Sequence, residues 1–454
     1  MKYRTPIAVD GFDPSTAELA KPDNQFSKTY TVKVITPIYG GGVKAGEPDT
    51  EMPIRASAIR GQLRYWWRFL YMNHPNNKQE REEDEEAFTK RLFVEERKIW
   101  GGMANAKELE EALKSGKDFS SKVFIKCGQT STKIETDQYK NEQPQYALFP
   151  ARENKREDIE AKYLIKEGFD FEMTITCKDV DFDSELKPAL RWWMTFGGIG
   201  ARTRRGLGSI DINDLEAISV EECPENCMLV IQNLDSDNAL VAWKKAVDTL
   251  ANFRQKPGVG RKIGKGNTPG RSLWPEPDSI REITGKHSTY KDYQCKDHHP
   301  NHDASISFPR AAFGLPIVFK FKDDSQGNNG CGEPQQTMLL PNKGDAERMA
   351  SPLILTPYKQ KGKYKPAALL LSTGHIDGME LKLKQGERNV EKPNYLSEEK
   401  EQEWEEKNWD QWSTNWWDSS KAKQVDPIKN NKGTNNATDA LTAFMNFFAE
   451  GGEK

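Results

Sequence analysis

The chain has 454 residues and a formal net charge of −3, with 66 lysines and arginines set against 69 aspartates and glutamates. This near-neutral balance excludes a bulk polycation, so any nucleic-acid binding must come from local basic patches. No apolar run approaches the roughly 18 residues that span a bilayer, and the first residues, MKYRTPIAVD, are not a signal peptide. The six cysteines show no disulfide framework, so we expect a cytoplasmic protein.

The first half of the chain predicts the order strand, helix, strand, strand, helix, strand. Alternating apolar residues predict strands over 28–37, 122–127, 169–177 and 208–213. Apolar residues at helical spacing predict helices over 57–72 and 185–196, and an acidic run over 80–86 is expected to flank a further helix. This order is typical of a ferredoxin-like βαββαβ unit.

The second half predicts another unit of the same kind. Periodicity fades near 218–227, so we expect two domains, residues 1–217 and 218–454. Apolar patterns predict a strand from 228, strands over 315–321, 337–340, 353–356 and 367–371, and helices over 239–253 and 439–448. The predicted fold class is α+β, with two ferredoxin-like domains and long insertions in the second.

The segment 197–208, named here the glycine-arginine loop, combines flexible backbone with positive charge. Arg202, Arg204 and Arg205 lie among five glycines: Gly197, Gly198, Gly200, Gly206 and Gly208. Glycine lets backbone amides approach a ligand, and guanidinium groups match phosphate. The loop has no lysine and follows a helix, which excludes a Walker A loop and a Rossmann turn. It is therefore predicted to hold a polyanion, the alternative being a tight junction between two elements.

Two further basic regions are candidate RNA contacts. Arg60, Arg64 and Arg68, named here the arginine row, share one face of the first helix, and Arg55 precedes it. These side chains either meet phosphate or pair with acids such as those of 80–86. The basic segment 253–273 contains no acid and is either a disordered linker or, as we favour, a loop that tracks phosphates. Its cations are Arg254, Lys256, Arg261, Lys262, Lys265 and Arg271.

A group of histidines and a tryptophan-rich segment each have more than one interpretation. Cys295, His298, His299 and His302, named here the histidine cluster, have a spacing that could bind zinc or serve acid–base catalysis, but a polar surface loop is favoured. In the tryptophan-rich segment 399–419, Trp409, Trp412 and Trp416 have the spacing of one helical stripe. That stripe would pack on its own domain or on a neighbouring subunit.

A family resemblance follows from the order of the motifs. TVKVITPIYGGG from Thr31, IRASAIRGQLRYWWRFLY from Ile54, IWGG from Ile99 and GGIGARTRRGLGS from Gly197 resemble the RAMP superfamily. More narrowly, they resemble the first Cmr subunit of type III-B CRISPR effector complexes. Later segments are similar to the same subunit type: PGRSLWP from Pro269, FPRAAFGL from Phe308 and SPLILTPY from Ser351. The resemblance implies domains in the style of the RNA-recognition motif.

The function that the resemblance implies is RNA binding without catalysis. The protein would be a subunit of a type III-B CRISPR ribonucleoprotein in antiviral defence, gripping guide (crRNA) or target RNA near the guide 3′ end, beside other Cmr subunits. We expect no catalytic residue, metal or cofactor. The rival hypothesis is an endoribonuclease, zinc-dependent or metal-independent, that uses the histidine cluster. A third is an assembly scaffold that touches only protein.

Overall fold

The computed structural model describes residues 25–102, 120–140, 143–154, 159–267, 269–289, 297–321, 331–344, 346–374, 376, 378–385, 410–433 and 436–452. Its contacts divide the chain into two compact units, each assembled from segments far apart in sequence. The first comprises Met1–Thr31, Arg55–Gln129 and Phe171–Leu190, and the second comprises Val32–Ile54, Thr130–Asp170 and Arg191–Lys454. The domain boundary between residues 217 and 218 stays a prediction.

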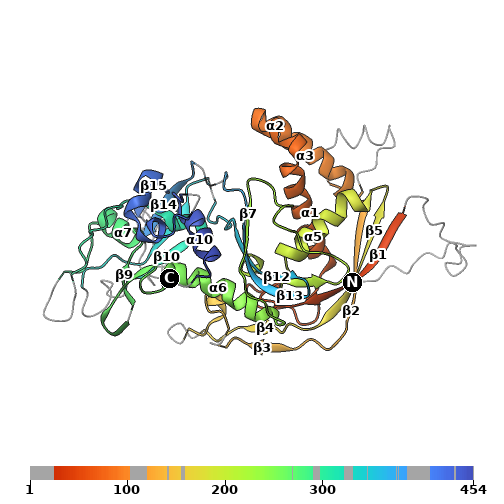
Figure 1. The fold of residues 1–454 in the computed structure, drawn as a ribbon, viewed down its shortest axis with the longest axis horizontal. Coiled ribbons are helices and arrows are strands. Elements are labelled where there is room, and N and C mark those ends of the chain that lie inside the picture. Colours follow the sequence, from red (N-terminus) through yellow and green to blue (C-terminus); the bar gives the residue numbers. More distant parts are fainter. Residues whose placement is uncertain are drawn as a thin grey trace, which may run out of the picture. The chain divides into compact units, whose positions relative to one another are not determined.

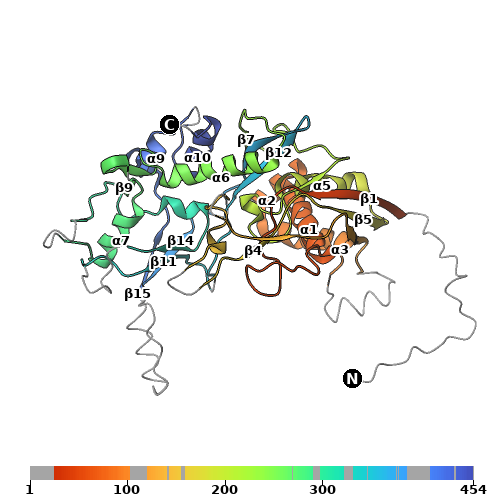
Figure 2. The same ribbon diagram turned by 90° about the horizontal axis from the view of Figure 1, so that it is seen from below.

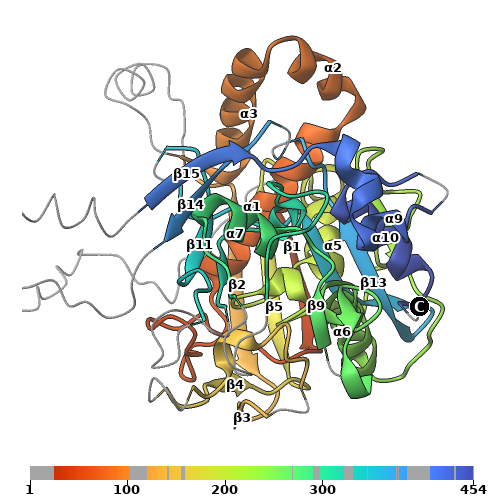
Figure 3. The ribbon, with the colours of Figure 1, turned by 90° about the vertical axis from the view of Figure 1, so that its left-hand side faces the viewer.

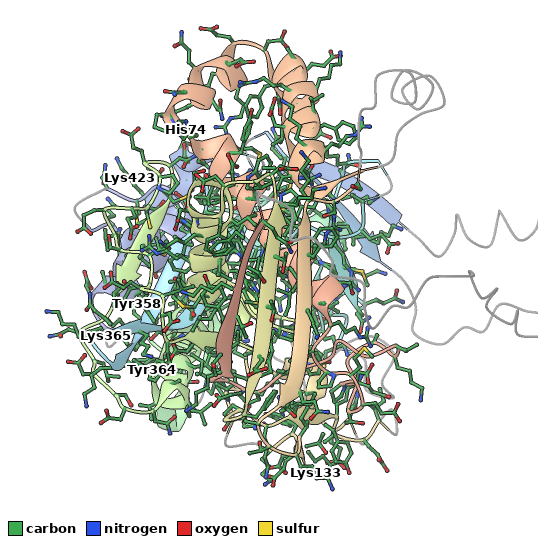
Figure 4. The ribbon with its side chains drawn as sticks, turned by 90° about the vertical axis from the view of Figure 1, so that its right-hand side faces the viewer. His74, Lys133, Tyr358, Tyr364, Lys365 and Lys423 are labelled. Carbon is green, nitrogen blue, oxygen red and sulfur yellow. The ribbon has the colours of Figure 1, made fainter. Side chains whose placement is uncertain are left out.

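Three consecutive helices of the first unit, coloured orange in Figure 1, are α1 Ala56–Asn73, α2 Pro75–Glu83 and α3 Glu85–Trp100. The predicted helix over 57–72 is confirmed, and its apolar stripe is buried at Ile59, Leu63 and Trp67. The acidic run does not flank one helix but spans the junction of α2 and α3. There the Asp84 carboxylate accepts the Ala87 amide at 2.9 Å and begins α3. His74, labelled in Figure 4, begins α2 by accepting the Asn76 amide.

A four-stranded sheet has the order β2-β5-β1-β6. Its strands are β1 Gln25–Val34, β2 Val123–Thr130, β5 Asp170–Lys178 and β6 Ile210–Ile212, which confirms the four strands predicted for the first half. β1 and β6 are antiparallel, with Val32 opposite Ile212. Phe171, Met173 and Ile175 of β5 are buried on alternate positions, as the sequence pattern requires.

The same half of the chain also contains α5 and a small hairpin. The five-residue π-turn Phe182–Leu186 leads into α5 Lys187–Phe196, so the predicted helix begins later than expected. β3 Thr136–Gln138 pairs with β4 Tyr163–Ile165, and neither strand was predicted from the sequence. Their three-residue length carries too little alternation to be detected.

The main sheet of the second half has the order β12-β13-β7, with β7 Met228–Ile231, β12 Leu353–Gln360 and β13 Lys363–Leu370. Helix α6 Ala239–Gln255 packs on β12 and β13 through an apolar face that includes Trp243 and Leu250. The helices α9 Asp426–Lys429 and α10 Ala440–Ala449 pack together, and α10 also packs on α6 (Figure 2). Tyr358 and Tyr364, labelled in Figure 4, lie on the hairpin of β12 and β13.

A second four-stranded sheet has the order β10-β11-β14-β15, and β11, β14 and β15 lie side by side in Figure 3. The strands are β10 Ile317–Phe319, β11 Thr337–Pro341, β14 Glu380–Gln385 and β15 Asp410–Asn415. β10, β11 and β14 share an apolar core with α7 Glu276–Thr284.

The helical interpretation of the tryptophan-rich segment is wrong where the structure describes it. Trp412 lies in β15, opposite Leu383 of β14, while Trp409 lies outside the described residues. Trp416 packs against the apolar core of the chain, as does Trp417. Pairing with β14 therefore overrides a helical spacing that rested on three residues.

The remaining elements are short. The hairpin of β8 Arg261–Ile263 and β9 Pro269–Ser272 occupies the basic segment. Single 3₁₀ turns cover Phe149–Ala151, Thr203–Arg205, Lys265–Asn267, Pro309–Phe313 and Ser419–Gln424. The chain is thus a mixed α and β protein with several small antiparallel sheets.

We expect Asp84→Ala to lower the free energy of unfolding by about 1 kcal/mol, because the first amides of α3 lose their acceptor. Chemical denaturation followed by circular dichroism measures this change. Asp84→Asn is the matched control and should retain most of the stability, since its amide oxygen can still accept from Ala87. Equal losses in both variants would contradict the capping role.

Candidate nucleic-acid interface

The glycine-arginine loop turns back on itself directly after α5. Its 3₁₀ turn lies between Arg202 (φ +60°) and Gly206 (φ +74°), both in the left-handed region. Loop amides are used inside the protein: Ile199 donates to Gly208, and Ala201 donates to Tyr39 at 2.7 Å. The loop is therefore a packed junction as well as a basic segment.

All three loop arginines donate to main-chain carbonyls from distant parts of the second unit. Arg202 Nε donates to Ala147 at 2.6 Å, and Arg204 Nη1 donates to Ser351. Arg205 donates through Nη1 to Leu353 at 2.9 Å and through Nη2 to Phe313 at 3.3 Å. Carbonyl oxygens satisfy the donors but leave the positive charge in place. The pKa of Arg205 is lowered to about 10, mainly by burial; the neighbouring arginines also lower it, and Tyr146 raises it.

The loop glycines are required by close packing. A Cβ on Gly206 would lie 2.6 Å from Trp243 Cδ1 and 2.9 Å from the Leu355 carbonyl oxygen. A Cβ on Gly208 would lie 1.9 Å from the Ile199 carbonyl oxygen, and one on Gly200 2.7 Å from Ile38 Cγ2. Gly197 and Gly198 are similarly enclosed, by Trp193 and by the loop itself. These glycines therefore hold the fold together, whatever the loop binds.

The arginine row of α1 is paired inside the first unit. Arg64 and Arg68 both bind the carboxylate of Glu96 on α3, and Arg60 donates to the Trp100 carbonyl. Glu96 is fully buried. The acidic partner is therefore Glu96 and not a residue of the 80–86 run, because the turn of α3 brings position 96 rather than position 86 against α1. Arg55 is the residue at which α1 begins.

The basic segment is ordered in part as a hairpin, so the disordered-linker alternative does not hold for its described residues. Arg261 donates to Gln255 and to the Gly270 carbonyl, and Arg271 binds Asp278 and the His299 carbonyl. Arg254 lies at the end of α6 and donates to the Tyr146 hydroxyl. Lys256 ends that helix, while Lys262 and Lys265 are exposed on the hairpin.

The histidines of the cluster are bound to the protein around them. His298 Nδ1 contacts the Glu333 carboxylate, which also binds Arg281. His299 Nδ1 lies 2.9 Å from the Pro300 carbonyl oxygen, and His302 Nε2 lies 3.2 Å from that of Leu273. Cys295 lies outside the described residues. In the described part of the chain, no three His, Cys, Asp or Glu side chains are arranged to hold a metal ion.

The expectation that the cysteines form no disulfide framework needs one correction. Cys331 is buried and disulfide-bonded, although the sequence predicts no such framework. The other described cysteines are free: Cys127, Cys177, Cys223 and Cys227. Sequence spacing alone could not reveal the bond, since it carries no information on which distant residues meet.

Sequence reasoning missed three residues that complete these sites. Glu96 pairs with Arg64 and Arg68 of the arginine row, Tyr146 accepts from Arg254, and Arg310 forms a buried ion pair with Glu276. Arg310 lies in the segment FPRAAFGL, where the family resemblance was a signal that could have drawn attention to it. Nothing local to Glu96 or Tyr146 distinguishes either residue from its neighbours.

Part of the chain matches the sequence model of a known protein family. Residues 31–211 match the sequence model of the RAMP superfamily. Within this match lie α1, α5 and the glycine-arginine loop.

Two solved structures are similar to the chain. One is Cmr1 from Pyrococcus furiosus in its apo form, at 16% identity and a TM-score of 0.37, covering 76% of this chain and 87% of that chain. The other is a chain of the Type III-B Cmr-beta complex bound to cognate target RNA, at 15% identity and a TM-score of 0.23. That match covers 42% of this chain and 59% of that one. No curated protein sequence matches the chain. Among the described helices, none combines the length and apolar character needed to cross a bilayer.

We expect Gly206→Ala to lower the free energy of unfolding by about 2 kcal/mol or more, because the left-handed backbone and the Trp243 contact both oppose a Cβ. Gly61→Ala is the control. Gly61 lies inside α1 with no atom within 4 Å of an added Cβ, so alanine should stabilise by about 0.5–1 kcal/mol. Denaturant titration of both variants checks the prediction, and a neutral Gly206→Ala would contradict it.

The buried carboxylate of Glu96 should make the stability of the fold depend on pH. Burial raises the pKa of this carboxyl, but hydrogen bonds from Arg64 and Arg68 outweigh burial and hold it below its ordinary value of 4.5. Its stabilisation is therefore present above pH 4.5 and is lost as the pH falls through the folded-state pKa. Glu96→Gln should cost about 1.5–3 kcal/mol at pH 7 and flatten the acid limb of the stability curve.

The control for this variant is Glu86→Gln on the same helix, where the exposed Glu86 pairs with the exposed Lys90. We expect little change in its free energy of unfolding at any pH. If the stability of Glu96→Gln falls at acid pH as that of the wild type does, a group other than Glu96 is responsible for the acid dependence.

Proposed function

We propose that the protein is a non-catalytic RNA-binding subunit of a type III-B CRISPR ribonucleoprotein, located in the cytoplasm with other Cmr subunits. The observation that carries this proposal is the RAMP superfamily match over residues 31–211, which includes the glycine-arginine loop. The order of motifs along the whole chain supports the narrower Cmr assignment. In this role the subunit grips guide or target RNA near the guide 3′ end, while base pairing supplies sequence recognition.

We also propose that each half of the chain is a ferredoxin-like unit. Support for the first comes from the element order β1-α1-β2-β5-α5-β6 and the sheet order β2-β5-β1-β6, in which the first and third strands of the unit are central. For the second, β7, α6, β12 and β13 supply a strand, a helix and two strands on which that helix packs.

The lack of catalysis is supported by the chemistry of the basic residues. Guanidinium groups stay protonated at neutral pH and position phosphates without transferring protons. His298 belongs to an ion-pair network with Glu333 and Arg281, and the ring nitrogens of His299 and His302 face carbonyl oxygens. Each of these contacts has a structural role that needs no substrate.

RNA binding is tested by replacing the exposed lysines of the β8–β9 hairpin. For a protein bound to single-stranded RNA, removing Lys262 and Lys265 together should flatten the slope of log affinity against log salt by about 1.4, or about 0.7 for each phosphate that the variant no longer neutralises. The decrease in affinity should be equal for RNAs of different sequence. Fluorescence anisotropy with labelled oligoribonucleotides at several salt concentrations measures both quantities.

The control removes the same charge from an acidic helix. Lys90 and Lys98 of α3 pair with Glu86 and Glu95, so replacing both by glutamine should leave the salt slope unchanged. An unchanged slope after replacing Lys262 and Lys265 places the hairpin outside the RNA path. A wild-type protein without RNA affinity favours the scaffold hypothesis.

The endoribonuclease alternative is tested in parallel. Labelled RNA incubated with the purified protein should stay intact, with or without chelator. Products that disappear in the double variant His298→Gln and His299→Gln would support the alternative instead.

A further inference from the structure

Three arginines from two segments of the second unit, the glycine-arginine loop and the end of α6, have contacts on the same neighbouring residues. Arg254 donates to the Tyr146 hydroxyl, and its guanidinium carbon lies 5.5 Å from the centre of the Tyr146 ring. Arg202 Nε binds the carbonyl of Ala147, the next residue along the chain. Arg205 Nη2 binds the Phe313 carbonyl, and the ring of Phe313 lies 5.4 Å from the Arg254 guanidinium carbon. The shared anchors are therefore Tyr146–Ala147 and Phe313.

A fourth arginine lies on the turn that carries Phe313. Arg310 is 7% exposed and forms an ion pair with Glu276, with 3.0 Å between Nε and Oε2. Burial lowers the pKa of Arg310, the Glu276 charge raises it, and the Arg254 charge lowers it again. Arg202, Arg205, Arg254 and Arg310 are named here the arginine cluster. In the described part of the chain, Glu276 is the one carboxylate that an ion pair joins to this cluster.

Among the described residues, an ion pair therefore joins only one of the four guanidinium groups of the cluster to a carboxylate. Arg202 and Arg205 bind neutral carbonyls, and Arg254 binds a neutral hydroxyl. The buried Nε of Arg254 has no hydrogen-bond partner among the described residues. Like charges that are brought together and desolvated destabilise a fold unless an anion joins them. The lowered pKa of Arg205, about 10, reflects that uncompensated burial.

The side chains of the arginine cluster differ in their exposure to solvent. Arg202 is exposed, Arg205, Arg254 and Tyr146 are half-buried, and Arg310 is buried. The cluster thus combines one guanidinium group that solvent reaches with others that are partly or fully desolvated, and charge-assisted hydrogen bonds are strong where water is excluded. The Tyr146 hydroxyl adds a neutral donor beside the guanidinium groups.

We propose that Arg202, Arg205 and Arg254 bind one phosphate group beside the Tyr146 hydroxyl. Arg310, held by Glu276, adds positive charge behind the site. Several guanidinium forks directed at one group match the tetrahedral oxygens of phosphate. The site itself rests on the geometry of the cluster, whereas RNA as the source of the phosphate rests on the proposed function.

The first experiment measures phosphate binding without RNA. Thermal unfolding of the full chain is compared in sodium phosphate and sodium chloride of equal ionic strength. We expect phosphate to raise the Tm of the wild type by about 2 °C at concentrations well above Kd. Arg254→Gln should abolish this rise and, by relieving repulsion, should not lower the Tm in chloride.

Two further variants separate binding from folding. Arg202→Gln changes an exposed side chain, so it should fold normally and still lose most of the phosphate-specific rise. The double variant Lys90→Gln and Lys98→Gln removes the same number of charges from α3, where both lysines pair with glutamates, and should keep the rise in full. A phosphate effect no larger than that of chloride, or one equal in wild type and Arg254→Gln, overturns the site.

The source of the phosphate is decided by a second experiment. If RNA supplies it, Arg254→Gln should weaken binding of a labelled oligoribonucleotide by tenfold or more, and inorganic phosphate should compete with the RNA. Oligoribonucleotides with and without a 5′-phosphate distinguish a terminal phosphate from an internal phosphodiester. Phosphate stabilisation without RNA affinity would keep the site and overturn the proposed function. RNA binding that is unchanged by inorganic phosphate and by Arg254→Gln would support the proposed function and overturn the phosphate site.

Discussion

The close approach of the main chain at Gly206 is the constraint on which the arrangement of the second unit depends. The Trp243 indole of α6 donates to the Arg205 carbonyl at 2.7 Å, and the Thr36 hydroxyl donates to the Gly206 carbonyl at 2.7 Å. Leu355 of β12 lies against the same glycine. A helix, a strand and the segment after β1 therefore meet at one turn, and they can do so because the turn has no side chain at its closest point.

That turn also determines where the charge of the loop is located. The left-handed residues on either side of Thr203–Arg205 direct Arg204 and Arg205 toward the carbonyls of Ser351, Leu353 and Phe313. A loop with the composition of a ligand cradle is thus first a packing junction. The phosphate binding that we propose would use the positive charge that the carbonyl contacts leave in place.

The two groups of arginines differ in how their charge is balanced. The arginine row of α1 meets the buried carboxylate of Glu96, so two of its three positive charges have an acidic partner within the first unit. In the arginine cluster, Glu276 binds Arg310, and the other three guanidinium groups bind neutral oxygens. An additional anion would gain less at the row than at the cluster, because two of the three guanidinium groups of the row already contact a carboxylate.

The sequence by itself determined the elements with strong periodicity and the residue types of the candidate site. Apolar alternation predicted β1 and β5, helical spacing predicted α1, α6 and α10, and the glycine-arginine loop stood out by composition. Only the tertiary structure decided that Trp412 lies in a strand, that Glu96 faces Arg64, and that Tyr146 and Phe313 lie beside Arg254. The physical reason is that periodicity records which face of an element is buried, whereas a contact between distant residues depends on how separate elements pack.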